Sequence, residues 1–157
     1  MSSTKTVDLD PTDRRLLNLL QADCALTNDE LARRAHVSAA TSLRRVRRLV
    51  QAGVIERRIA IIDPDAVGGV TAIVEVTLEQ QTAELLDRFE ANVAAAAEVQ
   101  QCYRVASGPD FVLVVFVADV AAYHAFAHRV LTAQANVRNV RSFFAVRRSR
   151  FEPKVPL

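Results

Sequence analysis

Four arginines lie close together between residues 44 and 48, and their side chains carry the clearest chemistry in this sequence. They are Arg44, Arg45, Arg47 and Arg48. A guanidinium group donates hydrogen bonds in a planar fork that matches phosphate oxygens and the edge of guanine. No Asp or Glu occurs between Ser38 and Gly53. The alternative, a solvated surface helix held by salt bridges, would need such acids, so we predict contact with double-stranded DNA.

A rigid helix must carry these arginines, and residues 27–53 predict two short helices joined by a tight turn. Thr27 and Glu30 have the spacing of a capping box. Residues 36–38 form the break, Ser38 is a good N-cap, and Gly53 suits a helix end. At about 100° per residue, the second helix has one apolar and one cationic face. The predicted apolar face consists of Ser42, Leu43, Val46, Leu49 and Val50.

The first domain is predicted to span residues 1–62. Asp10 and Pro11 predict the start of a further helix ahead of the pair. Residues 54–63 alternate well enough to be a strand, which would form a wing beside the helices. Small residues at the start of the second helix would allow close approach to a groove, so base-edge contacts are predicted for Ser38, Ala39, Ala40, Thr41 and Arg44. Phosphate contacts are predicted for Arg45, Arg47, Arg48, Arg57 and Arg58.

The charge distribution agrees with this assignment. The 157 residues carry a net charge of only +2. Residues 1–62 hold 11 Lys and Arg against 7 Asp and Glu, which gives +4, whereas residues 63–157 hold 9 against 11, which gives −2. No apolar run is long enough to span a membrane, and the N-terminus has no signal-peptide core. Cys24 and Cys102 are expected to be free thiols of a cytoplasmic protein.

A second domain is predicted over residues 70–157, after a hinge at residues 63–69 that contains Gly68 and Gly69. Its pattern is β-α-β-β-α-β, a ferredoxin-like plan, so the whole chain is α+β. Strands are expected at residues 70–78, 99–106, 111–117 and 140–148, and helices at residues 82–98 and from Asp119 through Leu131. Residues 111–117 are apolar at every position, so both faces of that strand should be buried. A second copy of the sheet would cover the face that the two helices leave open, which predicts a homodimer; the alternative cover is the chain's own tail, residues 151–157.

Catalytic and metal-binding constellations are weak. His124 and His128 share a helix face, but no third ligand is spaced to complete a metal site, and a surface pair is the simpler interpretation. Residues 107–110 lack a nearby histidine base, and no phosphate-binding glycine loop occurs. We therefore expect no enzyme activity, no cofactor and no metal.

At this point the chain resembles a known family. The pattern LAxxxxVSxxxxxRRVxxLxxxGVI from Leu31 to Ile55, followed by a hinge and a β-α-β-β-α-β domain, is similar to the Lrp/AsnC, or feast/famine, transcription regulators. The resemblance covers about residues 9–147. It implies an N-terminal winged helix-turn-helix domain, a C-terminal RAM domain, dimers that assemble to octamers, and a small effector, typically an amino acid, bound between dimers.

The resemblance also assigns effector residues. The effector loop would be Ala106, Ser107, Gly108, Pro109 and Asp110, leading into Phe111, with Ser142 near the pocket. The family pattern has glycine where Ser107 stands, and Arg58 replaces a common tyrosine of the wing. Two rival functions remain open. One is an architectural protein that wraps DNA without a ligand switch; the other is a small-molecule-binding ferredoxin-like protein whose helical domain binds a protein partner.

Overall fold

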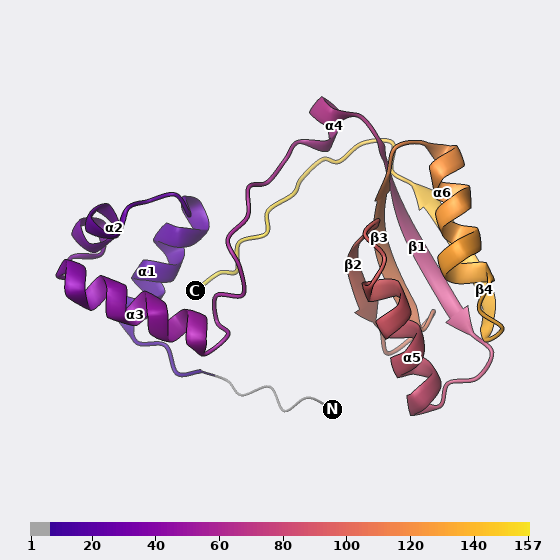
Figure 1. Cartoon of the computed structure of the whole chain (residues 1–157), viewed down its shortest axis with the longest axis horizontal. Helices are drawn as coiled ribbons and strands as arrows, with labels where there is room; N and C mark the ends of the chain where they lie inside the picture. Colours follow the sequence, from indigo (N-terminus) through magenta and orange to yellow (C-terminus); the bar gives the residue numbers. More distant parts are fainter. Residues whose placement is uncertain (1–6) are drawn as a thin grey trace. The chain divides into compact units, whose positions relative to one another are not determined.

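The computed structural model describes residues 7–157, and the part of the predicted polar N-terminus in residues 1–6 lies outside the described residues. The chain forms two compact units (Figure 1). The first contains the chain up to Ile61 together with Phe151–Leu157, and the second contains Ile62–Arg150. This division differs from the predicted one at the tail, which is predicted to belong to the second domain with the rest of residues 70–157.

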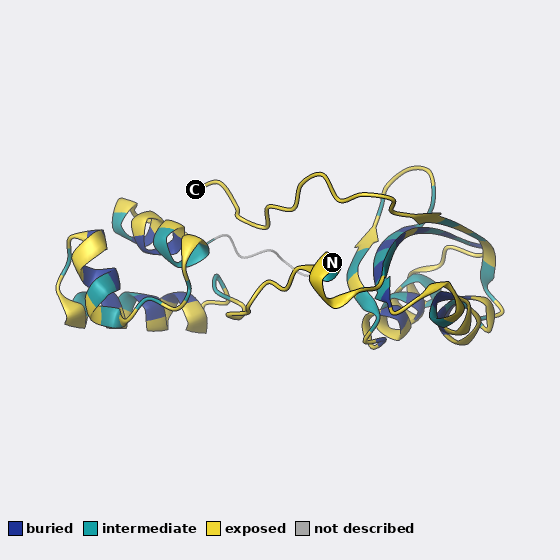
Figure 2. Cartoon of the chain, turned by 90° about the horizontal axis from the view of Figure 1, so that it is seen from above, coloured by how far each residue is buried: buried dark blue, intermediate teal, exposed yellow. Residues whose placement is uncertain are grey.

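The first unit is a bundle of three helices: α1 (Pro11–Ala22), α2 (Asn28–Ala35) and α3 (Ala39–Gln51). Each begins at its predicted N-cap, because the side chains of Asp10, Thr27 and Ser38 accept hydrogen bonds from backbone amides of the first turn. The inward faces are buried (Figure 2), and they supply a small core of Leu16, Leu31, Ala35 and Val46. The helix-turn-helix arrangement is therefore confirmed.

The turn between α2 and α3 has a feature that the sequence did not indicate. His36 adopts a left-handed conformation, with a φ of 57°, and ends α2. Two side-chain bonds hold the turn against its neighbours. Arg15 Nε donates to the Ala35 carbonyl at 3.3 Å, and Asn28 Nδ2 donates to the Ala39 carbonyl at 2.9 Å. The end of α2 is thereby tied to α1, and the start of α3 is tied to α2.

The predicted wing strand over residues 54–63 is wrong. This segment is irregular, and residues 56–63 are exposed. Ile59 and Ile61 are 60% and 56% exposed. Alternation alone does not make a strand, because the backbone groups also need a neighbouring strand to pair with. Within residues 7–157, the β-ladders involve only the four strands of the second unit.

The second unit has the predicted β-α-β-β-α-β plan after a short helix, α4 (Pro64–Val67). Its other elements are β1 (Val70–Leu78), α5 (Ala83–Ala94), β2 (Val99–Arg104), β3 (Phe111–Val117), α6 (Val120–Phe126), the π-helix η1 (Ala127–Thr132) and β4 (Val137–Phe144). The sheet order is β2-β3-β1-β4, with every neighbouring pair antiparallel. Strand β4 begins three residues earlier than predicted, and the π-helix was not predicted.

The helices α5 and α6 cover one face of the sheet (Figure 1). Alternate residues of β1 and β3, including Val74 and Leu113, are buried beneath them with Phe89 and Phe126. The linker joins this sheet through Gly69, where an added Cβ would lie 2.5 Å from the Phe116 ring. A side chain at that position would therefore collide with β3.

The outer face of the sheet is apolar at its centre. Ile73 pairs in register with Val114 on β3 and with Phe143 on β4. Ile73 and Phe143 are 37% and 46% exposed, while Val112, Val114 and Phe116 are half-buried. Within one protomer, β3 is thus fully buried on the face beneath the helices and only half-buried on the outer face, so the prediction of burial on both faces is partly met.

The tail Phe151–Leu157 lies against α1 and not over the outer face of the sheet, so the tail alternative for covering that face is wrong. Gln21 Nε2 donates to the Val155 carbonyl at 3.0 Å, and Val155 N donates to Gln21 Oε1 at 2.7 Å. Asn18 Nδ2 also reaches the Leu157 carbonyl at 3.4 Å. The end of the chain thereby returns to the first unit.

Candidate nucleic-acid interface

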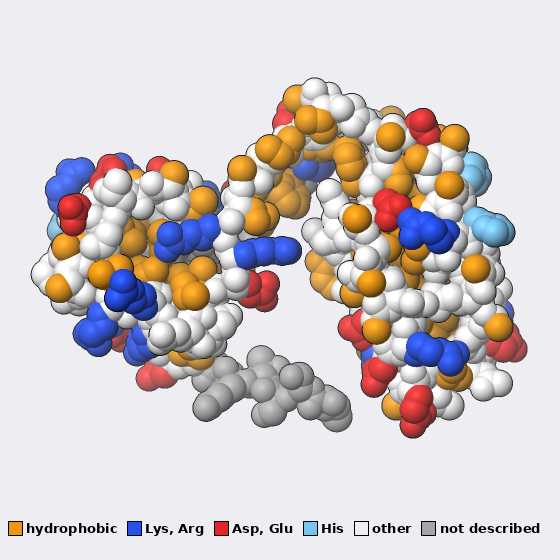
Figure 3. Space-filling model, in the orientation of Figure 1, with side chains coloured by type: hydrophobic (Ala, Val, Ile, Leu, Met, Phe, Trp, Pro, Cys, Tyr) orange, Lys and Arg blue, Asp and Glu red, His pale blue; other side chains and the backbone are white. Residues whose placement is uncertain are grey.

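Helix α3 presents two unpaired arginines to solvent. Arg44 and Arg47 are exposed, and neither forms an ion pair with any part of the chain that the structure describes. Basic side chains gather over the region of α3 in the space-filling view (Figure 3). These two guanidinium groups are available for an anionic partner.

Arg45 and Arg48 form ion pairs with acids at the start of α1. Arg45 Nη1 lies 2.5 Å from Asp10 Oδ2 and 2.9 Å from Asp13 Oδ1. Arg48 Nη2 pairs with Asp13 Oδ2. The stretch from Ser38 to Gly53 has no acid, as the sequence showed, but Arg45 and Arg48 find acidic partners on α1, more than thirty residues away in the sequence.

Two members of this ion-pair cluster, Asp10 and Arg45, have shifted pKa values. The hydrogen bond from Arg45 is the largest cause that lowers the pKa of Asp10 to about 2. The hydrogen bonds to Asp10 and then to Asp13 raise the pKa of Arg45. Both groups therefore stay ionised across the neutral range, and their charges cancel inside the first unit. The side chain of Arg45 is only 21% exposed, so the predicted phosphate contact at Arg45 is not supported by its position.

The start of α3 has small exposed residues. Ala39 and Ala40 are exposed, as predicted for a close approach to a groove. Ser38 Oγ caps the helix by accepting from Thr41 N at 3.2 Å, and it donates to Thr41 Oγ1 at 2.9 Å. The two hydroxyls predicted to contact bases are thus engaged with each other, although Ser38 remains exposed.

The buried face of α3 is narrower than predicted. Ser42, Val46 and Leu49 are buried, as expected. Leu43 and Val50 are 41% and 48% exposed, and at about 100° per residue both lie on one side of Val46, away from the buried Ser42 and Leu49. Arg57 and Arg58, predicted to project from a wing, are exposed on the irregular segment after α3.

In the second unit, the predicted effector loop is anchored by Asp110. Its Oδ2 accepts from Leu78 N at 2.7 Å, and its backbone N donates to the Val76 carbonyl at 2.9 Å. Val105 N donates to the Asp110 carbonyl at 3.0 Å. The Asp110 carboxylate thus closes the end of β1, a structural task that sequence reasoning did not identify.

Replacing Asp110 with alanine is expected to lower the free energy of unfolding by about 1.5–3 kcal/mol, since the amide of a buried residue would no longer have its charged acceptor. Urea denaturation would measure this change. Ser107→Ala, in the same loop but exposed, is the matched control and should change stability by less than about 0.5 kcal/mol. Unchanged stability in Asp110→Ala, together with weakened binding of a ligand, would instead assign Asp110 to ligand contact alone.

Ser142 does not join this loop within one protomer. It pairs with Val74 in β1, four residues and about 13 Å along the strand from Leu78. Its hydroxyl contacts the hydroxyl of Tyr123 in α6. The predicted effector residues therefore divide between the loop end of β1 and the layer beneath α6.

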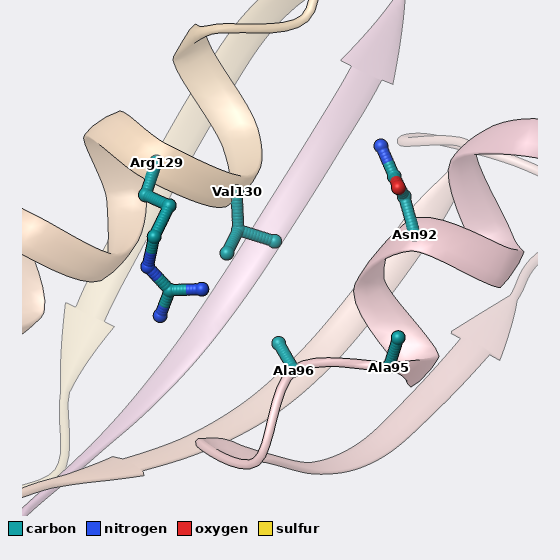
Figure 4. A pocket seen from close by; sticks show the side chains of 5 residues that line it. All are labelled: Asn92, Ala95, Ala96, Arg129 and Val130. Atoms are coloured by element: carbon teal, nitrogen blue, oxygen red, sulfur yellow. The ribbon is translucent and has the colours of Figure 1, made fainter.

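A small cavity of ≈ 190 Å³ lies elsewhere in this unit, between the end of α5 and the π-helix η1 (Figure 4). It is lined by Asn92, Ala95, Ala96, Arg129 and Val130, none of which was predicted to bind a ligand. Arg129 Nη2 is already paired with Glu98, at 2.5 Å.

Neither a metal-binding cluster nor a membrane-spanning helix occurs in residues 7–157. No group of three or more His, Cys, Asp or Glu side chains in that range is placed to hold a metal ion. None of the helices there is both long and apolar enough to cross a lipid bilayer.

Comparison with known families matches both units. Residues 9–56 match the winged helix-turn-helix DNA-binding family, and residues 71–155 match the Lrp/AsnC ligand binding domain. The second match alone covers more than half of the chain.

Named relatives agree over nearly the full length. The leucine-responsive regulatory protein of Rhizobium meliloti is 37% identical over 90% of this chain and 91% of its own. The DNA-binding transcriptional activator DecR of Escherichia coli is 31% identical over 95% and 99%. The feast or famine regulatory protein from M. tuberculosis, solved in complex with L-methionine, is 36% identical, covers 94% of this chain and 99% of its own, and has a TM-score of 0.82.

Proposed function

The chain belongs to the Lrp/AsnC family of transcriptional regulators, and from this premise we propose how it binds DNA. Helix α3 enters the major groove of double-stranded DNA. The protein acts in the cytoplasm. The observation that carries the proposal is the exposed, unpaired guanidinium of Arg44 next to the small residues Ala39 and Ala40. Small residues at the helix start permit the approach, and the fork of Arg44 suits the edge of guanine. Arg47, Arg57 and Arg58 contact phosphates.

The protein acts as a homodimer joined through the outer face of the sheet. The half-exposed row of Val114, Ile73 and Phe143 supports this arrangement, because an apolar face of this kind is rarely left to solvent. Dimers assemble further to an octamer. Two copies of α3 then read half-sites separated by about one turn of DNA or a multiple of it.

The second unit binds an amino-acid effector between dimers, and the complex of the M. tuberculosis relative with L-methionine supports this class of ligand. Backbone amides of the loop from Ala106 to Pro109 suit the ligand's carboxylate. One oxygen of Asp110 accepts from Leu78 N, and within residues 7–157 the other oxygen accepts no hydrogen bond, so it can face an ammonium group. Ligand bound between dimers biases their arrangement and hence the spacing of the recognition helices.

A thermal-shift series across the twenty amino acids tests the effector. A ligand that binds only the folded chain stabilises it by about 2.7 kcal/mol at a hundredfold excess over its Kd. This corresponds to a rise in Tm of several degrees for a chain of this size. L-methionine is the first ligand to test, with D-methionine as the matched control of identical charge and composition. A flat result for all twenty would remove the amino-acid effector and leave DNA binding untouched.

A further inference from the structure

Asp13 carries a buried carboxylate, and helix capping alone does not explain why it is buried. It is only 1% exposed. Its role in the capping box is a long hydrogen bond, in which Asp10 N donates to Asp13 Oδ2 at 3.3 Å. Burying a carboxylate is unfavourable unless its charge is paired, so the remaining contacts of Asp13 must account for its burial.

Those contacts all lead to α3. One oxygen of Asp13 accepts from Arg45 at 2.9 Å, and the other accepts from Arg48. The two arginines are three residues apart and so lie on one side of α3. Asp10 adds a second acid to Arg45, at 2.5 Å. The start of α1 thus clamps the middle of α3 through charged hydrogen bonds, which are shorter and stronger than neutral ones.

We propose that Asp13, supported by Asp10, is a positioning residue for DNA recognition. The ion pair with Asp13 keeps the guanidinium of Arg45 from contacting DNA and fixes the direction of α3. Arg44 and Arg47 are then the arginines of this helix that contact the duplex. The two carboxylates of Asp10 and Asp13 neutralise two of the four positive charges on α3. About half of the formal charge of this helix is then available to attract DNA. This inference rests on the proposed DNA binding and deepens it.

The salt dependence of DNA affinity tests the withdrawal of Arg45. The probes are a duplex enriched from a random library by in vitro selection with the full chain, and an unrelated duplex of equal length. Arg47→Gln should lower the slope of log affinity against log salt by about 0.9 for each phosphate that the arginine no longer neutralises. Arg45→Gln, the same chemical change two residues away, should leave the slope unchanged. An equal decrease of slope in both variants would overturn the proposal.

Asp13→Asn tests the positioning from the opposite side. This substitution breaks the ion pairs that hold Arg45 and Arg48. The freed arginines should steepen the slope of log affinity against log salt and raise the affinity for the unrelated duplex. The ratio of selected to unrelated affinity should fall at least about tenfold, because α3 is no longer held in one direction. A residue with a merely structural role would weaken both complexes without steepening the slope, and that result would also reject the inference.

Two further measurements keep these outcomes separable. Asp13→Glu retains the charge and should restore most of the selectivity, and circular dichroism with thermal unfolding reports whether each variant is folded. If Arg44→Gln and Arg47→Gln also leave DNA binding unchanged, the placement of α3 on DNA is at fault. If they weaken it as expected while Arg45→Gln does so equally, only the role of Asp13 is wrong.

Discussion

A chain carrying both Arg44→Gln and Arg47→Gln is expected to bind its selected duplex about 2–6 kcal/mol more weakly than the wild type. A good bidentate arginine–base contact is worth about 1–3 kcal/mol, and a dimer presents two copies of Arg44. Removal of Arg47 should in addition lower the salt slope by about 1.8 per dimer, at about 0.9 for each phosphate contact. Fluorescence anisotropy titrations at several salt concentrations would measure both quantities.

The matched control removes the same charge from the second unit. Arg88 and Arg138 are exposed there, and Arg88→Gln with Arg138→Gln should change affinity little. Equal weakening by both pairs of substitutions would mean that overall charge, not α3, governs binding. The wild type must also prefer the selected duplex over bulk DNA by at least about 10³, since a smaller preference would favour the architectural alternative.

Replacing Ile73 with aspartate is expected to raise the dissociation constant of the proposed dimer at least about a hundredfold. Ile73 lies at the centre of the outer sheet face, between Val114 and Phe143 in register. A symmetric interface would bury two uncompensated carboxylates, at a cost of several kcal/mol each. Sedimentation velocity over a range of concentrations would measure the shift from dimer to monomer.

Val120→Asp serves as the comparison variant. Val120 is 47% exposed at the first position of α6, on the helix side of the sheet, where an acidic residue suits the helix N-terminus. This variant should remain dimeric. A dimeric Ile73→Asp chain would place the interface on another surface and remove the argument from the apolar face.

The helix starts could be predicted from sequence because the chemistry that sets them is local. Asp10, Thr27 and Ser38 each cap the predicted helix with their own side chains. The β-α-β-β-α-β order was predictable for a similar reason, since strand and helix periods differ over short windows. The wing failed because the alternation of residues 54–63 contains no information about whether a partner strand is present.

The charge cluster could not be predicted from a single helix. Arg45 and Asp13 are 32 residues apart, and only the packing of α1 on α3 brings them together. The sequence places Asp13 as an acid in the first turn of α1. A favourable interaction with the helix dipole is enough to explain an acid there, so nothing in the sequence pointed to a partner on α3. Likewise, the contact of Ser142 with Tyr123 depends on which face of β4 meets α6, and the pairing register of β4 with β1 decides that.

The return of the tail to α1 makes the second unit an insertion. The polypeptide leaves the DNA-binding unit after Ile61 and rejoins it at Phe151, so it crosses between the units twice. Two units joined by a single linker can rotate about that linker. Two crossings oppose a full turn of one unit against the other, because such a turn would wind one crossing around the other. Torsion imposed on the inserted unit would therefore pass through both crossings to the helix that holds Gln21.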